Sequence, residues 1–183
     1  MISLMQAQAA AQFLSLVVFG MLARWYAVPW LGDRGRADAL TPLLWIHVFR
    51  YVALQAFSAQ RDGFPVSDGA LRDIVVGDLV GSVIALAAIL ALRRRLGVGL
   101  VLAWLLVVET AYDTVANIHG GVREHLLGQA SGVTWLILSY YVPLVVVSVV
   151  LIAWQLYSRR GEALTGVPRS VPAATTPSRA SPA

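Results

Sequence analysis

The chain contains no cysteine and no lysine. Without cysteine it can form no disulfide, thiolate nucleophile or cysteine metal site, and its redox compartment stays undetermined. Without lysine it can form no lysine Schiff base, which excludes a retinal-type chromophore protein and lysine-dependent covalent catalysis. All 14 basic residues are therefore arginines.

Charge is also scarce. Only 13% of the 183 residues are charged and 58% are apolar, and the mean hydropathy of +0.70 is too high for an ordinary soluble domain. We therefore expect a multi-pass protein of the cell membrane. A net charge of +4 could suit nucleic acid, but the arginines gather at the ends of apolar segments. The expected partners are the lipid bilayer and anionic lipid headgroups at the cytoplasmic face, with no nucleic acid.

Five apolar segments have about the 20 residues that a membrane-spanning helix needs. The sequence predicts an all-α bundle in one domain, residues 1–157, with spans at about 9–31, 42–60, 71–92, 99–118 and 133–157. The first segment is interpreted as a retained span rather than a cleaved signal peptide, because no lysine or arginine precedes it. Residues 158–183 are rich in Arg, Pro, Ser, Thr and Ala, which predicts a disordered cytoplasmic tail.

Local signals refine these spans. Thr41 and Pro42 suit the N-cap and first position of the second helix, and Ser67 or Asp68 suits the N-cap of the third. Pro143 should kink the fifth helix, because it lacks a backbone donor and crowds the preceding turn. The third helix also carries a ladder of small residues that favours close helix packing, within the chain or in a homodimer: Gly77, Gly81 and Ala85.

The arginines predict an orientation. With five spans, ten fall on one side (Arg24, Arg34, Arg36, Arg93, Arg94, Arg95, Arg159, Arg160, Arg169, Arg179) and three on the other (Arg61, Arg72, Arg123). The positive-inside rule then places the N-terminus outside and the C-terminus in the cytoplasm.

Polar residues interrupt the apolar spans. A carboxylate in the middle of a membrane costs about 2.5 to 3.5 kcal/mol on insertion scales, so such groups must face other helices, water or a partner. The candidates for binding a ligand or a proton are His47, Arg50, Tyr51, Asp78, Glu109, Asp113, Asn117 and Tyr140. From their depths, most of them should line a cavity that is open to the outside.

Arg50 and Glu109 fall at similar depth on different helices and should form an ion pair. That pair is either structural or part of a site. Asp78 and Asp113 add two further acids, so at least one carboxyl should be protonated or a cation should be bound. Asp113 is expected to lack a fixed cation. His47, one turn from Arg50, adds a group that titrates near neutrality.

Motifs of known chemistry are missing. No zinc-protease, Walker A, dinucleotide-binding or G-x-S-x-G pattern occurs, so we expect no metal and no cofactor, and no catalytic residue is assigned. His119 and His125 are interpreted as surface residues.

Three functions stay open. The first is a protein that binds or transports a small polar molecule or cation, with proton linkage. The second is a membrane-embedded acid/base enzyme acting on a lipid or isoprenoid. The third is a structural or accessory subunit of a membrane complex.

Overall fold

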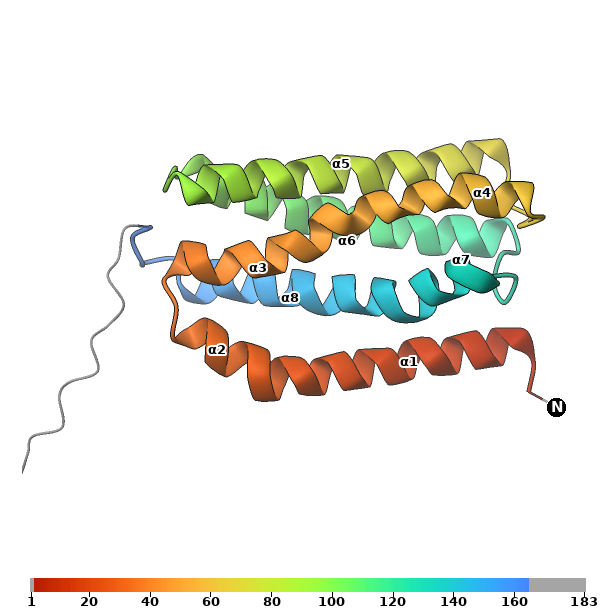
Figure 1. Ribbon diagram of the computed structural model, residues 1–183, viewed down its shortest axis with the longest axis horizontal. Helices are drawn as coiled ribbons and strands as arrows, with labels where there is room; N and C mark the ends of the chain where they lie inside the picture. The colour runs from red at the N-terminus through yellow and green to blue at the C-terminus, as the bar shows by residue number, and fades with distance from the viewer. Residues whose placement is uncertain (1, 165–183) are drawn as a thin grey trace, which may run out of the picture.

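The computed structural model describes residues 2–164, and every regular element within them is helical. Five long helices lie side by side (Figure 1), each of them long and apolar enough to cross a membrane. Their bounds are Leu4–Gly32, Arg36–Arg61, Asp68–Arg93, Val98–Arg123 and Gly132–Ser158. All five predicted segments are therefore helical, and each helix extends beyond its predicted span. Of the predicted tail, residues 165–183 lie outside the described residues.

Three of the five helices contain a π-helical or 3₁₀ segment along their length. The first consists of α1 (Leu4–Leu22), a π-helical turn (Ala23–Ala27) and α2 (Val28–Gly32), and the second of α3 (Arg36–Val48), a 3₁₀ segment (Phe49–Gln55) and α4 (Ala56–Arg61). The third and fourth, α5 (Asp68–Arg93) and α6 (Val98–Arg123), are α-helical throughout. The fifth consists of α7 (Gly132–Leu136), a π-helical turn (Ile137–Tyr141) and α8 (Val142–Ser158).

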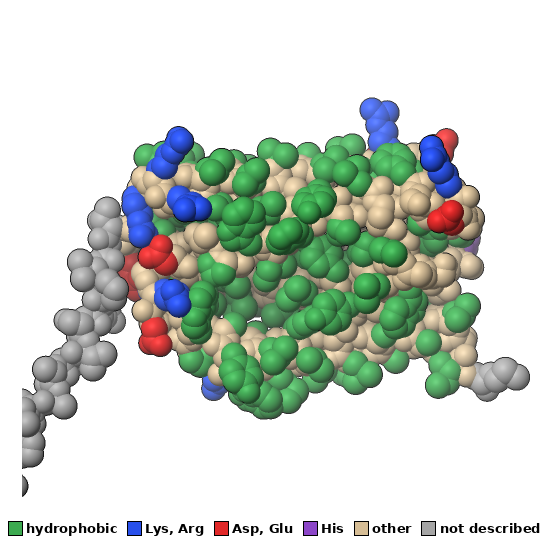
Figure 2. Space-filling view, viewed as in Figure 1, with side chains coloured by type: hydrophobic (Ala, Val, Ile, Leu, Met, Phe, Trp, Pro, Cys, Tyr) green, Lys and Arg blue, Asp and Glu red, His purple; other side chains and the backbone are tan. Residues whose placement is uncertain are grey.

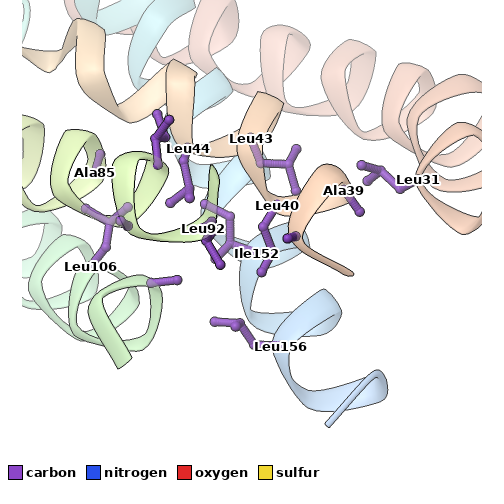
Figure 3. Packing of buried hydrophobic residues seen from close by; sticks show 14 residues of the cluster. Leu31, Ala39, Leu40, Leu43, Leu44, Ala85, Leu92, Leu106, Ile152 and Leu156 are labelled. Atoms are coloured by element: carbon purple, nitrogen blue, oxygen red, sulfur yellow. The ribbon is translucent and has the colours of Figure 1, made fainter. Parts of the chain in front are cut away.

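Both the surface and the core change in polarity along the length of the bundle. Figure 2 shows hydrophobic side chains across the middle of the visible face and charged side chains toward its two ends. A larger apolar cluster fills one end of the bundle, where Leu40 of α3, Leu92 of α5 and Ile152 of α8 point toward one another (Figure 3). A smaller apolar cluster at the other end comprises Val66, Leu71, Val75 and Leu126. Along the second helix, α5 and α6, polar side chains lie between the residues of the two apolar clusters.

The start of the second helix differs from the prediction. The prediction that Thr41 is its N-cap is wrong, because α3 begins at Arg36 and Gly35 is the N-cap. The Thr41 hydroxyl instead donates to the Ala37 carbonyl at 2.9 Å. Pro42 removes one backbone donor inside the helix, and burial of the flanking turns in the larger apolar cluster compensates. For α5 the predicted cap is confirmed, since Ser67 Oγ accepts from the backbone N–H of Ala70.

Pro143 affects the backbone hydrogen bonds of the helical turn that precedes it. The backbone N–H of Val142 donates to the carbonyl of Ile137, five residues back, and Pro143 has no N–H to donate. The carbonyl of Leu138 is thereby left without a donor in its own helix. Gln12 of α1 supplies one, its Nε2 lying 3.1 Å from the Leu138 oxygen. This bond ties α1 to the fifth helix.

We predict that Gln12→Leu loosens α1, because the Leu138 carbonyl then has no donor in an apolar setting. Its loss should lower the free energy of unfolding by about 1 to 3 kcal/mol. Thermal unfolding in detergent and protease cleavage of α1 measure the effect. Gln129→Leu, on an exposed loop residue, is the control.

A double variant sharpens this test. In Pro143→Ala the restored N–H allows the fifth helix to satisfy its own carbonyls. In that background Gln12→Leu should therefore lower the free energy of unfolding by less. Equal costs in both backgrounds would contradict the account of the Leu138 carbonyl.

Candidate functional site

Arg50 lies at the centre of a buried charge cluster. Its side chain is 2% exposed, and each of its three nitrogens donates to a different carboxylate. Nε lies 2.7 Å from Asp78 Oδ1, Nη1 2.7 Å from Glu109 Oε2, and Nη2 2.7 Å from Asp113 Oδ2. These four residues, from three helices, are called the Arg50 cluster below.

The local sequence explains how the acids converge. Glu109 and Asp113 are four residues apart on α6, so they share one face one turn apart. Asp78 faces them from α5, where small residues leave the necessary room. A Cβ at Gly77 would lie 2.1 Å from Asp113 Oδ1, and a Cβ at Gly81 would lie 2.2 Å from Arg50 Nη1.

The ladder of small residues therefore packs inside this chain. Gly77 and Gly81 accommodate the Arg50 cluster, and Ala85 is fully buried in the larger apolar cluster. The prediction of close packing at these positions holds within the chain. A homodimer through the face of Gly77 and Gly81 would have to displace these contacts.

Two neutral side chains add hydrogen bonds to the cluster. The Thr110 hydroxyl accepts from Arg50 Nη1 at 3.0 Å and donates to Glu109 Oε2 at 3.2 Å. Asn117 Nδ2 donates to Asp113 Oδ2 at 3.0 Å. Asn117 was among the predicted residues, whereas Thr110 was missed, although its position next to Glu109 on an apolar helix was an available signal.

The Arg50 cluster carries more negative than positive charge. With all three carboxyls ionised, one guanidinium faces three negative charges. The acids are mostly shielded, with side-chain exposures of 22% for Asp78 and 13% each for Glu109 and Asp113. Within residues 2–164, Glu109 Oε1 is buried and has no hydrogen-bond partner. A carboxyl oxygen without a donor is one that can itself carry a proton.

The expectation that Asp113 lacks a fixed cation is wrong. A guanidinium presents donors in three directions, so one arginine can serve three carboxylates at once. The predicted pair of Arg50 and Glu109 is present, but it is one edge of a larger cluster. Sequence depth placed Arg50 and Glu109 at one level and Asp78 and Asp113 in the outer half, and it did not give the rotation of each helix about its axis.

His47 forms a separate buried contact. It is fully buried, and its Nε2 lies 2.9 Å from the hydroxyl of Ser148 on α8. Within the described part of the chain, its Nδ1 has no hydrogen-bond partner. Ser148, which sequence reasoning missed, connects α3 to α8 one turn below Arg50.

Tyr51 and Tyr140 do not join the Arg50 cluster. They are 47% and 53% exposed, and the Tyr140 ring packs edge-on against Phe19 at a centroid distance of 4.9 Å. Both line an apolar groove of about 320 Å³, called the tyrosine groove below, between the 3₁₀ segment and the fifth helix. Tyr141 also lines it and turns inward, its hydroxyl donating to the Ile46 carbonyl at 2.6 Å.

The side chains at the end of α6 and in the loop after it behave as surface groups. His119 and His125 are exposed. The carboxylate of Glu124 accepts from the hydroxyl and the backbone N–H of Ser67, and these hydrogen bonds hold the pKa of Glu124 below its usual value. Within residues 2–164, no group of three or more His, Cys, Asp or Glu side chains is arranged to hold a metal ion.

We predict that Gly81→Ala destabilises the protein, because its Cβ would lie 2.2 Å from Arg50 Nη1 and 2.9 Å from Glu109 Oε2. Such overpacking typically costs about 1 to 3 kcal/mol. Gly69→Ala on the same helix is the control, since nothing lies within 4 Å of its Cβ. Thermal unfolding in detergent compares them, and equal stabilities would contradict the packing of Arg50 against α5.

Comparison with known proteins gives one match. No curated protein and no solved structure matches the chain. One protein-family model matches residues 7–157, which include all five helices' apolar segments and the whole Arg50 cluster. The chain therefore belongs to the family described as Domain of unknown function (DUF8737).

Proposed function

We propose that this protein is a five-span membrane protein that binds a proton or a small cation at the Arg50 cluster, reached from the outer side, and links this binding to transport. Binding of a small polar molecule that carries positive charge is included. In this proposal the protein spans the cell membrane with its N-terminus outside and its C-terminus in the cytoplasm.

The five apolar helices and the apolar surface between charged ends support insertion in a membrane. The arginine distribution supports the orientation. Arg93, Arg94 and Arg95 follow the third span, whereas the opposite ends of the helices carry few arginines.

The observation that carries the proposal is the excess of acid around Arg50. Three carboxylates lie 2.7 Å from one guanidinium, which leaves two negative charges uncompensated if all three ionise. An apolar surrounding opposes such a charge, because it solvates ions poorly. A proton or a cation shared among the acids relieves it, and either one can exchange.

Access from outside is supported by the direction of the polar face on α6. Asn117 lies one turn beyond Asp113, toward the proposed outer end, and is hydrogen-bonded to it. Toward the cytoplasm, the buried side chains change to the larger apolar cluster, which includes Ala103 and Leu106 of the same helix. On the outer side the polar face continues to Asn117 before the smaller apolar cluster, which is less extensive than the larger one, so the shorter apolar barrier lies toward the outside.

A second candidate is a membrane-embedded acid/base enzyme acting on a lipid or isoprenoid. The tyrosine groove favours it, because its apolar lining, between the second and fifth helices, suits a hydrocarbon chain. This enzyme would change the lipid profile of cells that carry the gene relative to a deletion strain. The transport proposal requires no such change.

We predict that wild-type protein in liposomes carries protons or small monovalent cations down an imposed gradient, and that Glu109→Gln does not. The substitution keeps the shape of the side chain but removes one exchangeable charge. Internal pH and cation dyes measure the flux. Asp73→Asn, which removes an exposed carboxylate from α5 outside the Arg50 cluster, is the control and should behave as wild type.

Two checks make the result decisive. The chain has no cysteine, so impermeant thiol labels on single-cysteine variants report vesicle sidedness. Thermal unfolding separates loss of flux from loss of folding. Folded Glu109→Gln with wild-type flux, or wild type no better than empty vesicles, would overturn the proposal. A Glu109→Gln variant that fails to fold would favour the structural-subunit alternative, and folded Asp113→Asn then takes its place in the test.

A further inference from the structure

A second concave site lies at the proposed cytoplasmic end of the bundle. It is a groove of about 360 Å³ between the end of α2, one face of α3 and the end of α5. Its lining includes Trp30, Arg34, Asp38, Thr41, Trp45 and Arg93. We call it the tryptophan–arginine groove. It shares no residue with the Arg50 cluster, and the function proposed above does not use it.

The groove carries unneutralised positive charge. Its one acid, Asp38, already accepts from Arg95, with both carboxylate oxygens 3.2 Å from Arg95 Nη2. Arg34 and Arg93 are exposed, and within residues 2–164 neither side chain donates a hydrogen bond to another residue. Among the described residues, these two guanidinium groups therefore face the groove without a counter-ion.

Trp30 orients one of these groups. The Arg34 guanidinium carbon lies 3.8 Å from the centre of the Trp30 ring. A guanidinium stacked on an indole by its face keeps its edge N–H groups free, and those groups match the paired oxygens of a phosphate. Arg34 is thus held in a position to bind an anion.

The tryptophans indicate that this anion belongs to a lipid. Trp30 and Trp45 are 43% and 40% exposed, and exposed tryptophan is characteristic of the boundary between the hydrocarbon and the headgroups. Toward the middle of the bundle the exposed side chains become apolar, as with Phe49 on the same helix as Trp45. A ligand fixed by its phosphate in the groove would have an apolar surface available for its chains.

We propose that the tryptophan–arginine groove binds the phosphate of an anionic glycerophospholipid from the cytoplasmic leaflet. The inference rests on the membrane insertion and orientation proposed above, but it does not depend on proton or cation binding. An anionic headgroup is favoured over a choline headgroup, because choline would bring a further cation close to Arg34 and Arg93.

Native mass spectrometry of the delipidated full-length protein in detergent tests this proposal. Phosphatidylglycerol and phosphatidylcholine with the same acyl chains are the probes. Wild type should retain phosphatidylglycerol in preference. The double variant Arg34→Gln, Arg93→Gln should lose about thirtyfold in affinity for it. The matched control, Arg61→Gln with Arg72→Gln, removes the same charge from exposed positions at the opposite end and should keep the preference.

Further measurements distinguish a lipid phosphate from free phosphate, and distinguish failure of this proposal from failure of the transport proposal. Inorganic phosphate should displace the lipid poorly, and efficient displacement would show a free-phosphate site and overturn the lipid assignment. Equal retention of the two lipids, or equal loss in both double variants, would also overturn it. Glu109→Gln should bind phosphatidylglycerol as wild type does, so failure of the transport proposal leaves this result unaffected. If the double variant does not fold, Arg93→Gln alone should still lower the preference.

Discussion

One guanidinium that pairs with three carboxylates determines the arrangement of the helices at the centre of this bundle. Arg50 of the second helix contacts Asp78 on the third and both Glu109 and Asp113 on the fourth. None of these groups can be left unpaired in an apolar surrounding without a large free-energy cost. Their shared contact therefore sets the rotation and the level of three helices at once. It also leaves an excess of acid, from which the proposed function follows.

The backbone and the small residues around the Arg50 cluster make this contact sterically feasible. Arg50 itself lies in a 3₁₀ segment in the middle of the second helix, a conformation often found at functional bends. Gly77 and Gly81 leave space that a methyl group would occupy. Apolar clusters fill the bundle toward both ends. Polar chemistry is therefore concentrated at one level, and the tryptophan–arginine groove forms a second, separate polar site at one end.

Much of this architecture could be predicted from composition and spacing. Apolar length gave the five helices, and depth along them brought Arg50 and Glu109 together. The remaining contacts depended on how each helix is rotated, which spacing does not give. The π-helical turn before Pro143 inserts extra backbone and changes the phase of the fifth helix. Tyr141 rather than Tyr140 therefore turns inward. The contact between His47 and Ser148 joins residues far apart in sequence and had no local signal.

The central claim is that the three carboxyls of the Arg50 cluster are not all ionised with Arg50 as their only cation. Infrared spectroscopy of the protein in a bilayer at neutral pH tests it, because a protonated carboxyl has a carbonyl stretch distinct from that of a carboxylate. We expect either a protonated-carboxyl band that disappears in Glu109→Gln or Asp113→Asn, or carboxylate bands that shift when the bound cation is exchanged. A spectrum of fully ionised carboxylates, unchanged by cations and by either substitution, would contradict the account.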